Sequence, residues 1–577
     1  MVSAKGKELS FNSFILGVCT IIVILYIAIK ILGGVNINFV VLHIFFTVVL
    51  MYLLIKINVK NKIKISSLTP LALIIIPVVS VFVAERIYYS SVALVIVIGL
   101  VSGYIATRFL RNSEENGDED VRISQWFIIP IFILAFFVRA YVFATPEVPL
   151  GYDTPAYLIL ALKASKMEVW ELLRIGLSFS GDAYTDNWNF SMLWLGLAAK
   201  LFGWLELDLL VIPKFFIPAI SAACVVPIFL FVREVSNSTF AFYSALIFSI
   251  LPSELLFCDL YKEILGEFLL ILSLYLFVRF GNKKNALNLI LFLVSAFLLW
   301  KVAVTAFSKF AMFLVALLPI LAFYGKINFR IPIYLTLLIP VILMLGHFFP
   351  LVSFSLQPVR PMVNDPYTRF SFPIILLTDS TAFLLALSGL FVFLSSSSKF
   401  RKAYAVGAAI FLAIMVYTGI LSGIMGYRIF PSSFFLNTFR VALYLSIPLS
   451  ILAGAFLMEM RLKRGLFLVL LALLACDLVL AVNSETTIHS PSRFYSYISV
   501  EDYEKLSKLD YTNYSRVVLV GNFTWSPDTK NYSVGNWIKY IVFSKTGQLP
   551  EVYEEMPDVN EALVIIYQND RIYVKRC

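Results

Sequence analysis

Two acidic sites beside apolar segments are the first candidates for chemistry. Asp153 stands in the stretch LGYDTPAY (150–157), and Asp259 and Glu263 stand in CDLYKE (258–263). Carboxylates can act as general bases or as ligands of a divalent cation. Asp259 and Glu263 are four residues apart, so they share one face if this segment is helical. Charges next to apolar segments are energetically costly, which makes these acids functional candidates.

Each acid also has a purely structural interpretation. Asp153 precedes a helix-forming stretch, where an aspartate commonly accepts hydrogen bonds from the first-turn N–H groups. Asp259 has the same alternative in a tight turn between two apolar segments, with Lys262 in solvent. The sequence supports both interpretations of each residue.

Basic residues form the second candidate group. Lys262, Arg360 and Arg428 lie between apolar segments, and Arg440 lies within one. Such cations bind phosphate, and an arginine can hold it through two parallel hydrogen bonds. Their alternative role is to reach toward lipid headgroups. Together with the acids, they predict a site for a lipid phosphate and a base. Other cations at the same predicted surface are Arg139, Lys214, Lys301, Lys309 and Arg369.

The chain that positions these residues is unusually apolar. Of its 577 residues, 60% are hydrophobic and 14% are charged, and the mean hydropathy is +0.87. A soluble domain has about 45–50% apolar and about 25% charged residues, so the composition predicts a polytopic membrane protein and excludes a disordered chain. The net charge of +10 comes from short basic clusters between apolar segments, which is typical of cytoplasmic loops. We therefore expect membrane lipids and no nucleic acid as partners.

Fifteen apolar segments are interpreted as membrane spans, which need about 20 residues each. They are Phe11–Leu32, Asn38–Leu54, Leu68–Ala84, Ser91–Leu110, Gln125–Ala144, Leu207–Val232, Thr239–Phe257, Ile264–Phe280, Ala286–Trp300, Val304–Tyr324, Ile331–Pro350, Phe372–Leu394, Ala403–Leu421, Phe434–Leu457 and Gly465–Val482. With the N-terminus in the cytoplasm, inner Lys and Arg outnumber outer ones by more than two to one. This bias predicts an integral membrane protein with a cytoplasmic N-terminus and an extracytoplasmic C-terminus. We expect it in the cell membrane.

Two long polar segments fall on the predicted outer side. The loop 145–206 contains an apolar stretch, Phe190–Trp204, that is too short to span and is predicted to lie at the interface. The tail 484–577 predicts a small α/β domain, with strands at Arg516–Val520 and Ala562–Tyr567 and a hairpin over Tyr567–Val574. Helices are expected at Ser499–Leu509 and Val534–Ser544.

The acids and their surroundings resemble the GT-C superfamily of membrane glycosyltransferases, which includes protein O-mannosyltransferases, aminoarabinose transferases and oligosaccharyltransferase catalytic subunits. In that superfamily the first core span exits into an outer loop that opens with an acidic motif. YDTPAY (152–157) stands in that place, followed by a predicted amphipathic helix, Leu158–Leu177. The interfacial helix ends in KLFG (200–203), and two spans return to a second outer acid, Asp259.

The resemblance covers Gln125–Phe280 best and has clear departures. Thr154 stands where the family often has a second acid, and the tail lacks the Trp-Trp-Asp-Tyr-Gly motif of oligosaccharyltransferases. The implied fold is a polytopic α-helical membrane protein of about 15 transmembrane helices. Its parts are four additional helices (1–124), a GT-C-like core with the outer loop 145–206 (125–483), and a small extracytoplasmic α/β domain (484–577).

The resemblance implies an inverting transfer of a sugar from a polyprenyl-phosphate donor, such as a dolichyl phosphate, to an extracytoplasmic protein, lipid or glycan acceptor. Asp153 is then the general base. Asp259 either positions the acceptor or, with Asp153 and Glu263, holds Mg²⁺ or Mn²⁺, which some relatives need and others do not. Lys262, Arg360, Arg428 and Arg440 are the expected ligands of the donor phosphate.

Two other classes fit the same composition. A transporter or flippase of a lipid-linked sugar also needs many spans and outer cations, although transporters tend to place polar groups near the bilayer midplane. A membrane scaffold needs no convergence of the acids. The discriminating observation is whether Asp153 and Asp259 face one outer cleft.

Overall fold

The structure is a computed structural model that describes residues 124–151, 153–180, 183–256, 261–303, 438–460, 498–511, 513–523, 531–559, 561–568 and 571–576. Single positions at 305–307, 309–310, 313–314, 379, 382, 385–386, 389, 474 and 478 are described as well. The predicted spans before residue 124, and most of those between 304 and 437, lie outside the described residues.

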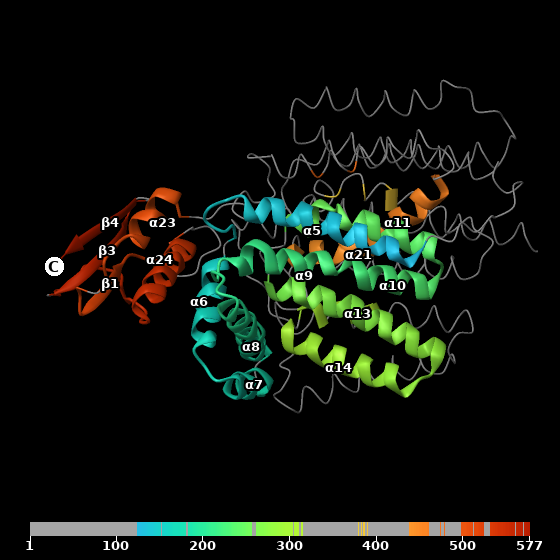
Figure 1. Cartoon of the computed structure of the whole chain (residues 1–577), viewed down its shortest axis with the longest axis horizontal. Helices are drawn as coiled ribbons and strands as arrows, with labels where there is room; N and C mark the ends of the chain where they lie inside the picture. Colours follow the sequence, from blue (N-terminus) through green and yellow to red (C-terminus); the bar gives the residue numbers. More distant parts are fainter. Residues whose placement is uncertain are drawn as a thin grey trace, which may run out of the picture.

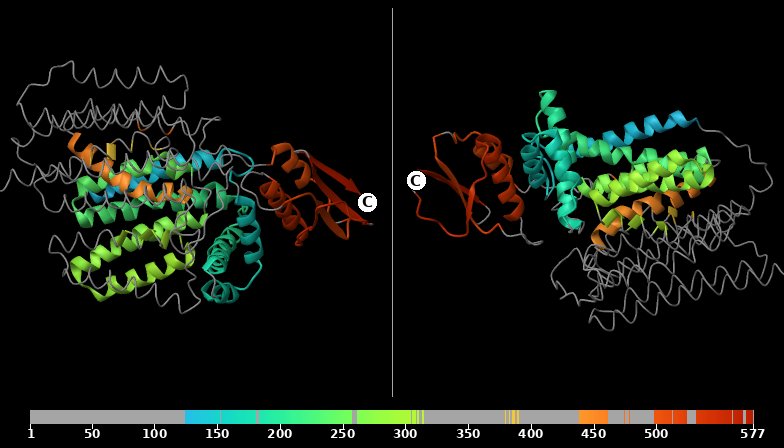
Figure 2. Two further views of the ribbon diagram at one scale, coloured as in Figure 1. Left: turned by 180° about the vertical axis from the view of Figure 1, so that it is seen from behind. Right: turned by 90° about the horizontal axis from the view of Figure 1, so that it is seen from below.

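The described part is mostly helical, with a body of roughly aligned helices and a small sheet domain at one end (Figure 1). In the body, α11 (Ser238–Ser249) packs on α21 (Thr438–Met460) and on α10 (Val225–Val235). Helix α13 (Tyr261–Lys283) packs on α14 (Ala286–Val302) and also on α10. Both views in Figure 2 show the sheet domain at the same end, with α6, α7 and α8 between it and the body. The helices of the body are α5 (Ile128–Ala144, after η1, Gln125–Phe127), η2 (Ile212–Phe216), α9 (Ile217–Ala223), α10 (Val225–Val235), α11 (Ser238–Ser249), α12 (Pro252–Leu256), α13 (Tyr261–Lys283), α14 (Ala286–Val302) and α21 (Thr438–Met460).

Two described helices are long and apolar enough to cross a membrane. They are Ile212–Val235, which combines η2, α9 and α10, and α13, at 24 and 23 residues. Shorter apolar helices are Ile128–Ala144, Ser238–Ser249, Ala286–Val302 and Leu443–Met458. These helices coincide with predicted spans, whereas the total of fifteen spans and their sidedness stay predictions.

Two predicted segments have different boundaries in the structure. The span predicted at Thr239–Phe257 is interrupted between α11 and α12, where Pro252 cannot continue the helix ladder of α11. The single amphipathic helix expected at Leu158–Leu177 consists of two helices. The break expected between Trp300 and Val304 is confirmed, because α14 ends at Val302 and Ala303 is extended.

Three helices, α6 (Thr154–Ser165), α7 (Val169–Leu177) and α8 (Ala183–Trp204), form a layer between the body and the sheet domain (Figure 1). Their mutual packing depends on glycine. A Cβ on Gly196 of α8 would stand 2.6 Å from the Ala164 Cβ, and a Cβ on Gly176 of α7 would stand 2.5 Å from the Leu193 Cβ. Because neither distance is sterically possible, hydrogen at these positions allows the helices to approach closely. The interfacial helix predicted at Phe190–Trp204 is the second part of α8.

The C-terminal domain is a four-stranded mixed sheet with helices α23 (Val500–Ser507) and α24 (Asn531–Thr546). The strand order is β2-β1-β3-β4, with β1 (Arg516–Val520) parallel to β2 (Glu551–Tyr553) and β3 (Ala562–Gln568), and β3 antiparallel to β4 (Arg571–Arg576). The predicted strands, hairpin and helices are therefore confirmed to within a few residues. Strand β2 was not predicted, because three exposed residues carry no alternation.

Candidate functional site

Asp153 stands at the first residue before α6. Its backbone carbonyl accepts from the Tyr157 N–H at 3.1 Å, so it occupies the helix cap. Its side chain makes no capping hydrogen bond. Thr154 instead turns inward, and its Oγ1 donates to the Leu150 carbonyl at 2.6 Å. The capping role considered for the Asp153 carboxylate is therefore wrong, while the half-buried carboxylate stays a candidate base.

The start of α6 meets the start of α13. The Tyr261 hydroxyl lies 3.4 Å from Thr154 Oγ1, and the Tyr261 ring stacks on Tyr157 with 4.6 Å between centroids. Trp188 of α8 stacks on the other side of Tyr157 at 5.4 Å. We call this contact of α6, α8 and α13 the α6–α13 junction. It joins Asp153 to the helix that begins two residues after Asp259, which itself lies outside the described residues.

Lys262 brings a cation to the α6–α13 junction. It lies in the first turn of α13, with Nζ 4.3 Å from the centroid of the Trp188 ring. A cation over an aromatic face is held by the electrostatic field of the ring. The Trp188 ring thereby orients the half-buried side chain of Lys262 beside the aromatic stack. The same stack includes Tyr157 of α6, the helix that follows Asp153.

Glu263 lies deeper, between α13 and α21. Thr305 Oγ1 donates to both carboxylate oxygens of Glu263, at 2.8 and 2.6 Å, and the Tyr444 hydroxyl donates to Oε2. Glu263 is buried, and it belongs to α13 rather than to the turn expected at 258–263. Hydroxyl groups of two other segments therefore orient the Glu263 carboxylate, and its role as a ligand of Mg²⁺ or Mn²⁺ stays a prediction.

The structure does not test the remaining predicted site residues. Asp259, Arg360 and Arg428 lie outside the described residues, and Arg440 lies in α21 with an undescribed side chain. Within the residues that the structure does describe, no group of three or more His, Cys, Asp or Glu side chains could hold a metal ion. The convergence of Asp153 with Asp259 therefore stays a prediction.

A second polar cluster joins residues 178–187, between α7 and the start of α8, to the end of α14. The Lys301 ammonium lies 3.4 Å from Asp186 Oδ2 and donates to the Ser178 carbonyl. It also lies 3.9 Å from the centroid of the Phe179 ring. Asn187 Nδ2 donates to the carbonyls of Trp300 and Lys301 at 3.1 and 2.8 Å. Asp186 is not among the predicted site residues. The pair Asp186-Asn187, just before the stretch predicted to lie at the interface, could have indicated a polar contact there.

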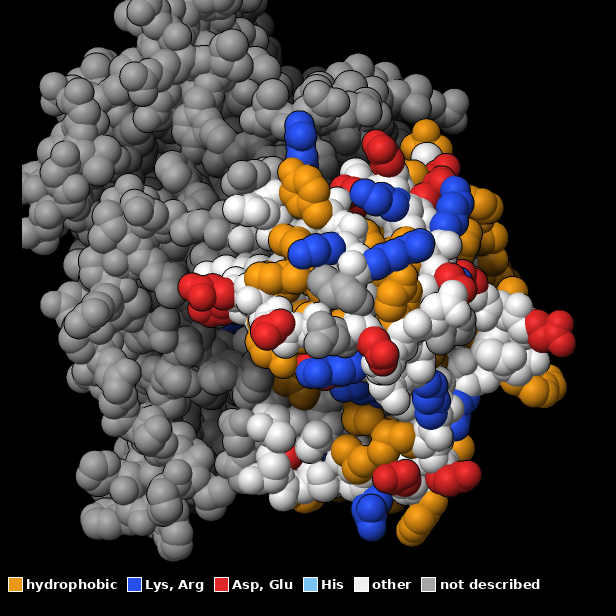
Figure 3. Space-filling view, turned by 90° about the vertical axis from the view of Figure 1, so that its left-hand side faces the viewer, with side chains coloured by type: hydrophobic (Ala, Val, Ile, Leu, Met, Phe, Trp, Pro, Cys, Tyr) orange, Lys and Arg blue, Asp and Glu red, His pale blue; other side chains and the backbone are white. Residues whose placement is uncertain are grey.

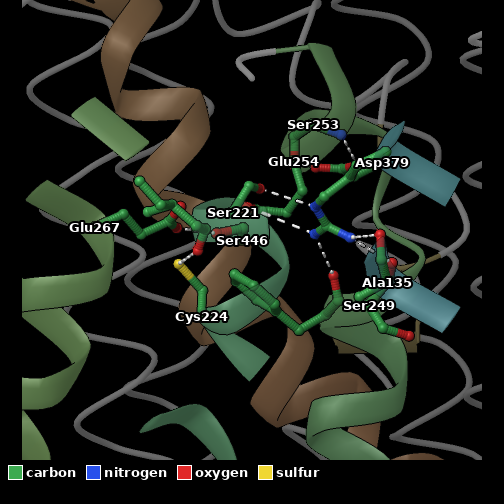
Figure 4. A network of polar contacts seen from close by, with 12 residues as sticks. Ala135, Ser221, Cys224, Ser249, Ser253, Glu254, Glu267, Asp379 and Ser446 are labelled. Carbon is green, nitrogen blue, oxygen red and sulfur yellow. Dashed lines mark hydrogen bonds and ion pairs between the residues drawn. The ribbon is translucent and has the colours of Figure 1, made fainter. Parts of the chain in front are cut away.

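Arg139 forms a third cluster where α11 stops (Figure 4). Its guanidinium donates to Ser221 Oγ at 2.8 Å, to the Ser249 carbonyl at 2.8 Å and to the Phe248 carbonyl at 3.4 Å. The last two acceptors are carbonyls of the final turn of α11, where helical partners run out. On the other side of the break, Asp379 Oδ1 accepts from the Ser253 N–H of α12 at 2.9 Å. The interrupted helix is thus completed by side chains from other segments.

The C-terminal domain supports α6 from the side opposite the body. Leu158 of α6 and Val148 belong to the same apolar cluster as Trp537 of α24. Lys166, at the end of α6, has its Nζ 4.8 Å from the centroid of the Phe543 ring. The α6–α13 junction is therefore held between the helical body and the sheet domain.

Burial and hydrogen bonding shift the pKa values of several titratable groups in the C-terminal domain. Burial lowers the pKa of Lys539 and raises the pKa of Tyr540. Hydrogen bonds from Arg516 and Tyr553 hold the pKa of Glu551 below its ordinary value. Basic, acidic and apolar side chains are interspersed on the end of the molecule formed by this domain (Figure 3). We assign no chemistry to these groups.

Comparison with solved structures finds a likeness to the oligosaccharyltransferase of Archaeoglobus fulgidus. Its apo form gives a TM-score of 0.45 at 12% sequence identity and covers 72% of this chain and 63% of that one. The enzyme AglB from the same organism, solved with an inhibitory peptide and a dolichol-phosphate, gives a TM-score of 0.45 at 14% identity, with 74% and 64% covered. This chain therefore spans less than two thirds of the length of that enzyme.

The likeness concerns the course of the chain and assigns no residue, because both TM-scores are below 0.5. No protein-family model matches the chain, and no curated protein matches it.

Proposed function

We propose that this chain is an integral membrane glycosyltransferase that transfers a sugar from a polyprenyl-phosphate-linked donor to an extracytoplasmic hydroxyl acceptor, with inversion. The observation that carries the proposal is the position of Asp153. Its carboxylate opens α6 without capping it, and α6 meets the start of α13 at the Thr154–Tyr261 contact. This position places a carboxylate where the start of α6 meets the start of α13.

Asp153 serves as the general base in this proposal. A carboxylate works as a base when it lies within hydrogen-bond reach of the acceptor hydroxyl in the bound state. The backbone around it is fixed on both sides, since Thr154 is tied to the Leu150 carbonyl and to Tyr261. A fixed base holds the acceptor oxygen in one orientation, which removes part of the entropic barrier.

Lys262 stabilises the departing phosphate. Its ammonium is held over Trp188, on the helix that contacts the start of α6. A positive charge oriented before the reaction stabilises the negative charge that develops on the leaving oxygen. Arg360, Arg428 and Arg440 stay candidates for the same role.

The proposed reaction is a single displacement. The acceptor hydroxyl loses its proton to Asp153 as its oxygen forms a bond to the anomeric carbon. The bond between that carbon and the phosphate oxygen breaks, and the bonding electrons leave with the lipid phosphate. Attack opposite the leaving group inverts the configuration. Asp153 then returns its proton to solvent.

The test is an assay of the purified full chain in lipid nanodiscs with a synthetic polyprenyl-phosphoryl sugar. The expected result is release of the lipid phosphate together with formation of a glycoside of inverted configuration on hydroxyl-bearing peptides, glycans or lipids. The proposal would be contradicted if neither donor hydrolysis nor sugar transfer occurred with monophosphate and diphosphate donors.

A flippase of a lipid-linked sugar is the second candidate. The interruption between α11 and α12 favours it, because discontinuous helices with polar groups at the break are common in transporters. Reconstitution into vesicles separates the two functions. A transferase releases lipid phosphate in nanodiscs, where no second compartment exists, whereas a flippase moves intact donor between leaflets and releases none.

A further inference from the structure

Two fully buried glutamates lie in the interior beside the break between α11 and α12. Glu254 belongs to α12 and Glu267 to α13, and both are 0% exposed. Ser446 of α21 donates from Oγ to Glu267 Oε1 at 2.9 Å. The side chains of Glu254 and Glu267 are close neighbours, and Ser446 lies beside both. Figure 4 shows both glutamates and Ser446 in one interior region, reached from three helices.

Within the part of the chain that the structure describes, donors are too few for two ionised carboxylates. Both oxygens of Glu254 and Oε2 of Glu267 are buried there without a hydrogen-bond partner, and the buried Ser253 hydroxyl has none either. An unsatisfied buried carboxylate oxygen is costly in a protein interior. These oxygens therefore require a positively charged partner.

Arg139 is the nearest described cation, but it is directed mainly elsewhere. Four of its hydrogen bonds go to Ser221 Oγ and to the carbonyls of Ala135, Phe248 and Ser249. It approaches Glu254 Oε2 only to 3.8 Å. Its charge is thus shared between the end of α11 and Glu254, and Glu267 forms no ion pair with a cation of the described residues.

Other charged groups of the described helical body include the buried Lys309, one helical turn after Thr305. Asp379 adds a further acid beside Glu254, and Cys224 donates to the Ile220 carbonyl at 3.6 Å. Glu263 stands one helical turn before Glu267 and accepts from Thr305 and Tyr444. On the other packed helices, Arg233 and Glu234 lie at the far end of α10, and Lys301 of α14 is paired with Asp186.

We propose that Glu254 and Glu267 form a binding site for one small monovalent cation, either a proton or a sodium ion, held between their carboxyl groups. Two carboxyl groups in contact cannot both ionise in a low-dielectric interior unless a cation separates them. A proton satisfies them by making one an acid that donates to the other. A sodium ion would use the same oxygens, with the Ser253 hydroxyl as an additional oxygen ligand. The site is independent of the proposed sugar transfer.

The experiment is thermal unfolding of the full chain in nanodiscs from about pH 6 to about pH 9, above the ordinary range of Glu. It is carried out in choline chloride, potassium chloride and sodium chloride. In choline, the Tm of the native chain should fall by several degrees as pH rises, because loss of the proton leaves two repelling carboxylates. Glu267→Gln should abolish this fall, since the amide cannot ionise and donates to Glu254.

The salts distinguish the two cations. Recovery of the alkaline Tm by sodium but not by potassium identifies a sodium site, and identical curves in all three salts identify a proton site. A matched control is Glu504→Gln, which removes an exposed carboxylate paired with Lys508 and should keep the native pH profile. Equal pH profiles of the native chain and Glu267→Gln, with no sodium effect, would overturn the proposal.

A measurement on the native chain covers the case in which Glu267→Gln does not fold. In choline chloride near neutral pH, the infrared spectrum should contain the C=O stretch of a buried carboxylic acid. This band should disappear at alkaline pH or on addition of sodium, and it should be absent in Glu254→Gln. Its absence from the native spectrum at neutral pH in choline would also overturn the proposal.

Discussion

Two regions of the helical body hold acids in opposite ways. At the α6–α13 junction, Asp153 lies half-buried at a helix start, and aromatic stacking and hydroxyl contacts fix the surrounding backbone. In the cluster around Arg139, Glu254 and Glu267 are sealed from solvent, and several carboxylate oxygens have no protein donor. We propose a general base in the first arrangement and a cation-binding site in the second.

The difference separates positions where a substitution should affect rate from positions where it should affect stability. A half-buried acid that stabilises no helix can be neutralised at little cost to the fold. A buried charge that completes an interrupted helix cannot be removed without leaving uncompensated partners. Gly266, between Glu263 and Glu267 on α13, lies where the two regions adjoin.

Asp153→Asn should give the largest effect on activity. We expect kcat for sugar transfer to fall about 10²–10⁴-fold, the range typical for loss of a general base, while Tm and donor affinity stay close to the native values. The matched control is Glu147→Gln, an exposed acid in the same loop, which should retain native activity. Native activity in Asp153→Asn would remove this residue from the mechanism.

Arg139→Met should give the largest effect on stability. The change leaves Glu254 and the carbonyls of Phe248 and Ser249 without their donor, and breaking a buried pair costs about 3–5 kcal/mol. Unfolding followed by tryptophan fluorescence in nanodiscs measures the loss. Arg174→Met, at an exposed position of α7, should be neutral. A neutral Arg139→Met would show that the cluster does not stabilise the break.

Gly266→Ala tests the boundary between the regions. A Cβ at this position would stand 2.8 Å from the Ala306 Cβ and 2.9 Å from the Ala303 Cβ, so overpacking should destabilise by about 1–3 kcal/mol. Gly281→Ala, on the same helix with nothing within 4 Å, should be neutral or slightly stabilising. Equal stability of the two variants would contradict close packing of α13 at Gly266.

Lys262→Gln should give the smallest effect. Loss of one charge-assisted contact to the donor phosphate is expected to raise KM for the lipid-linked sugar about tenfold, with little change in Tm. The effect should weaken as salt is added, because salt screens a half-exposed charge. An unchanged KM would assign the phosphate contact to another cation.

The sequence predicts the C-terminal domain well and the acids of the body poorly. Strand alternation and the Ser499 cap report local structure, so β1, β3, β4, α23 and α24 could be found from neighbouring residues alone. The burial of Glu254 and Glu267 depends on contacts with α5 and α21, which are distant in sequence. No local pattern encodes such contacts. In the sequence, both acids lie inside apolar runs, which predict only membrane spans.

The same limit explains the two helix boundaries that differ. Pro252 was a visible signal for the break after α11, but the apolar composition on both sides concealed it. The second boundary, the division of the predicted helix Leu158–Leu177 between Ser165 and Val169, is marked by neither proline nor glycine in the sequence. The end of α14 at Val302 agrees with the predicted break, and there Asp186 and the Ser178 carbonyl satisfy the Lys301 ammonium.

The most direct test of the account asks whether Asp153 and Asp259 line one cleft on the outer side. In a background lacking the native cysteines, Asp153→Cys and Asp259→Cys are combined and treated with a short membrane-impermeant bifunctional thiol reagent on intact cells. We predict efficient cross-linking of this pair, and no cross-linking when Asp153→Cys is paired with Lys575→Cys, an exposed position of β4 in the sheet domain (Figure 1). Failure of the first pair to cross-link, with both single cysteines labelled from outside, would contradict the shared cleft.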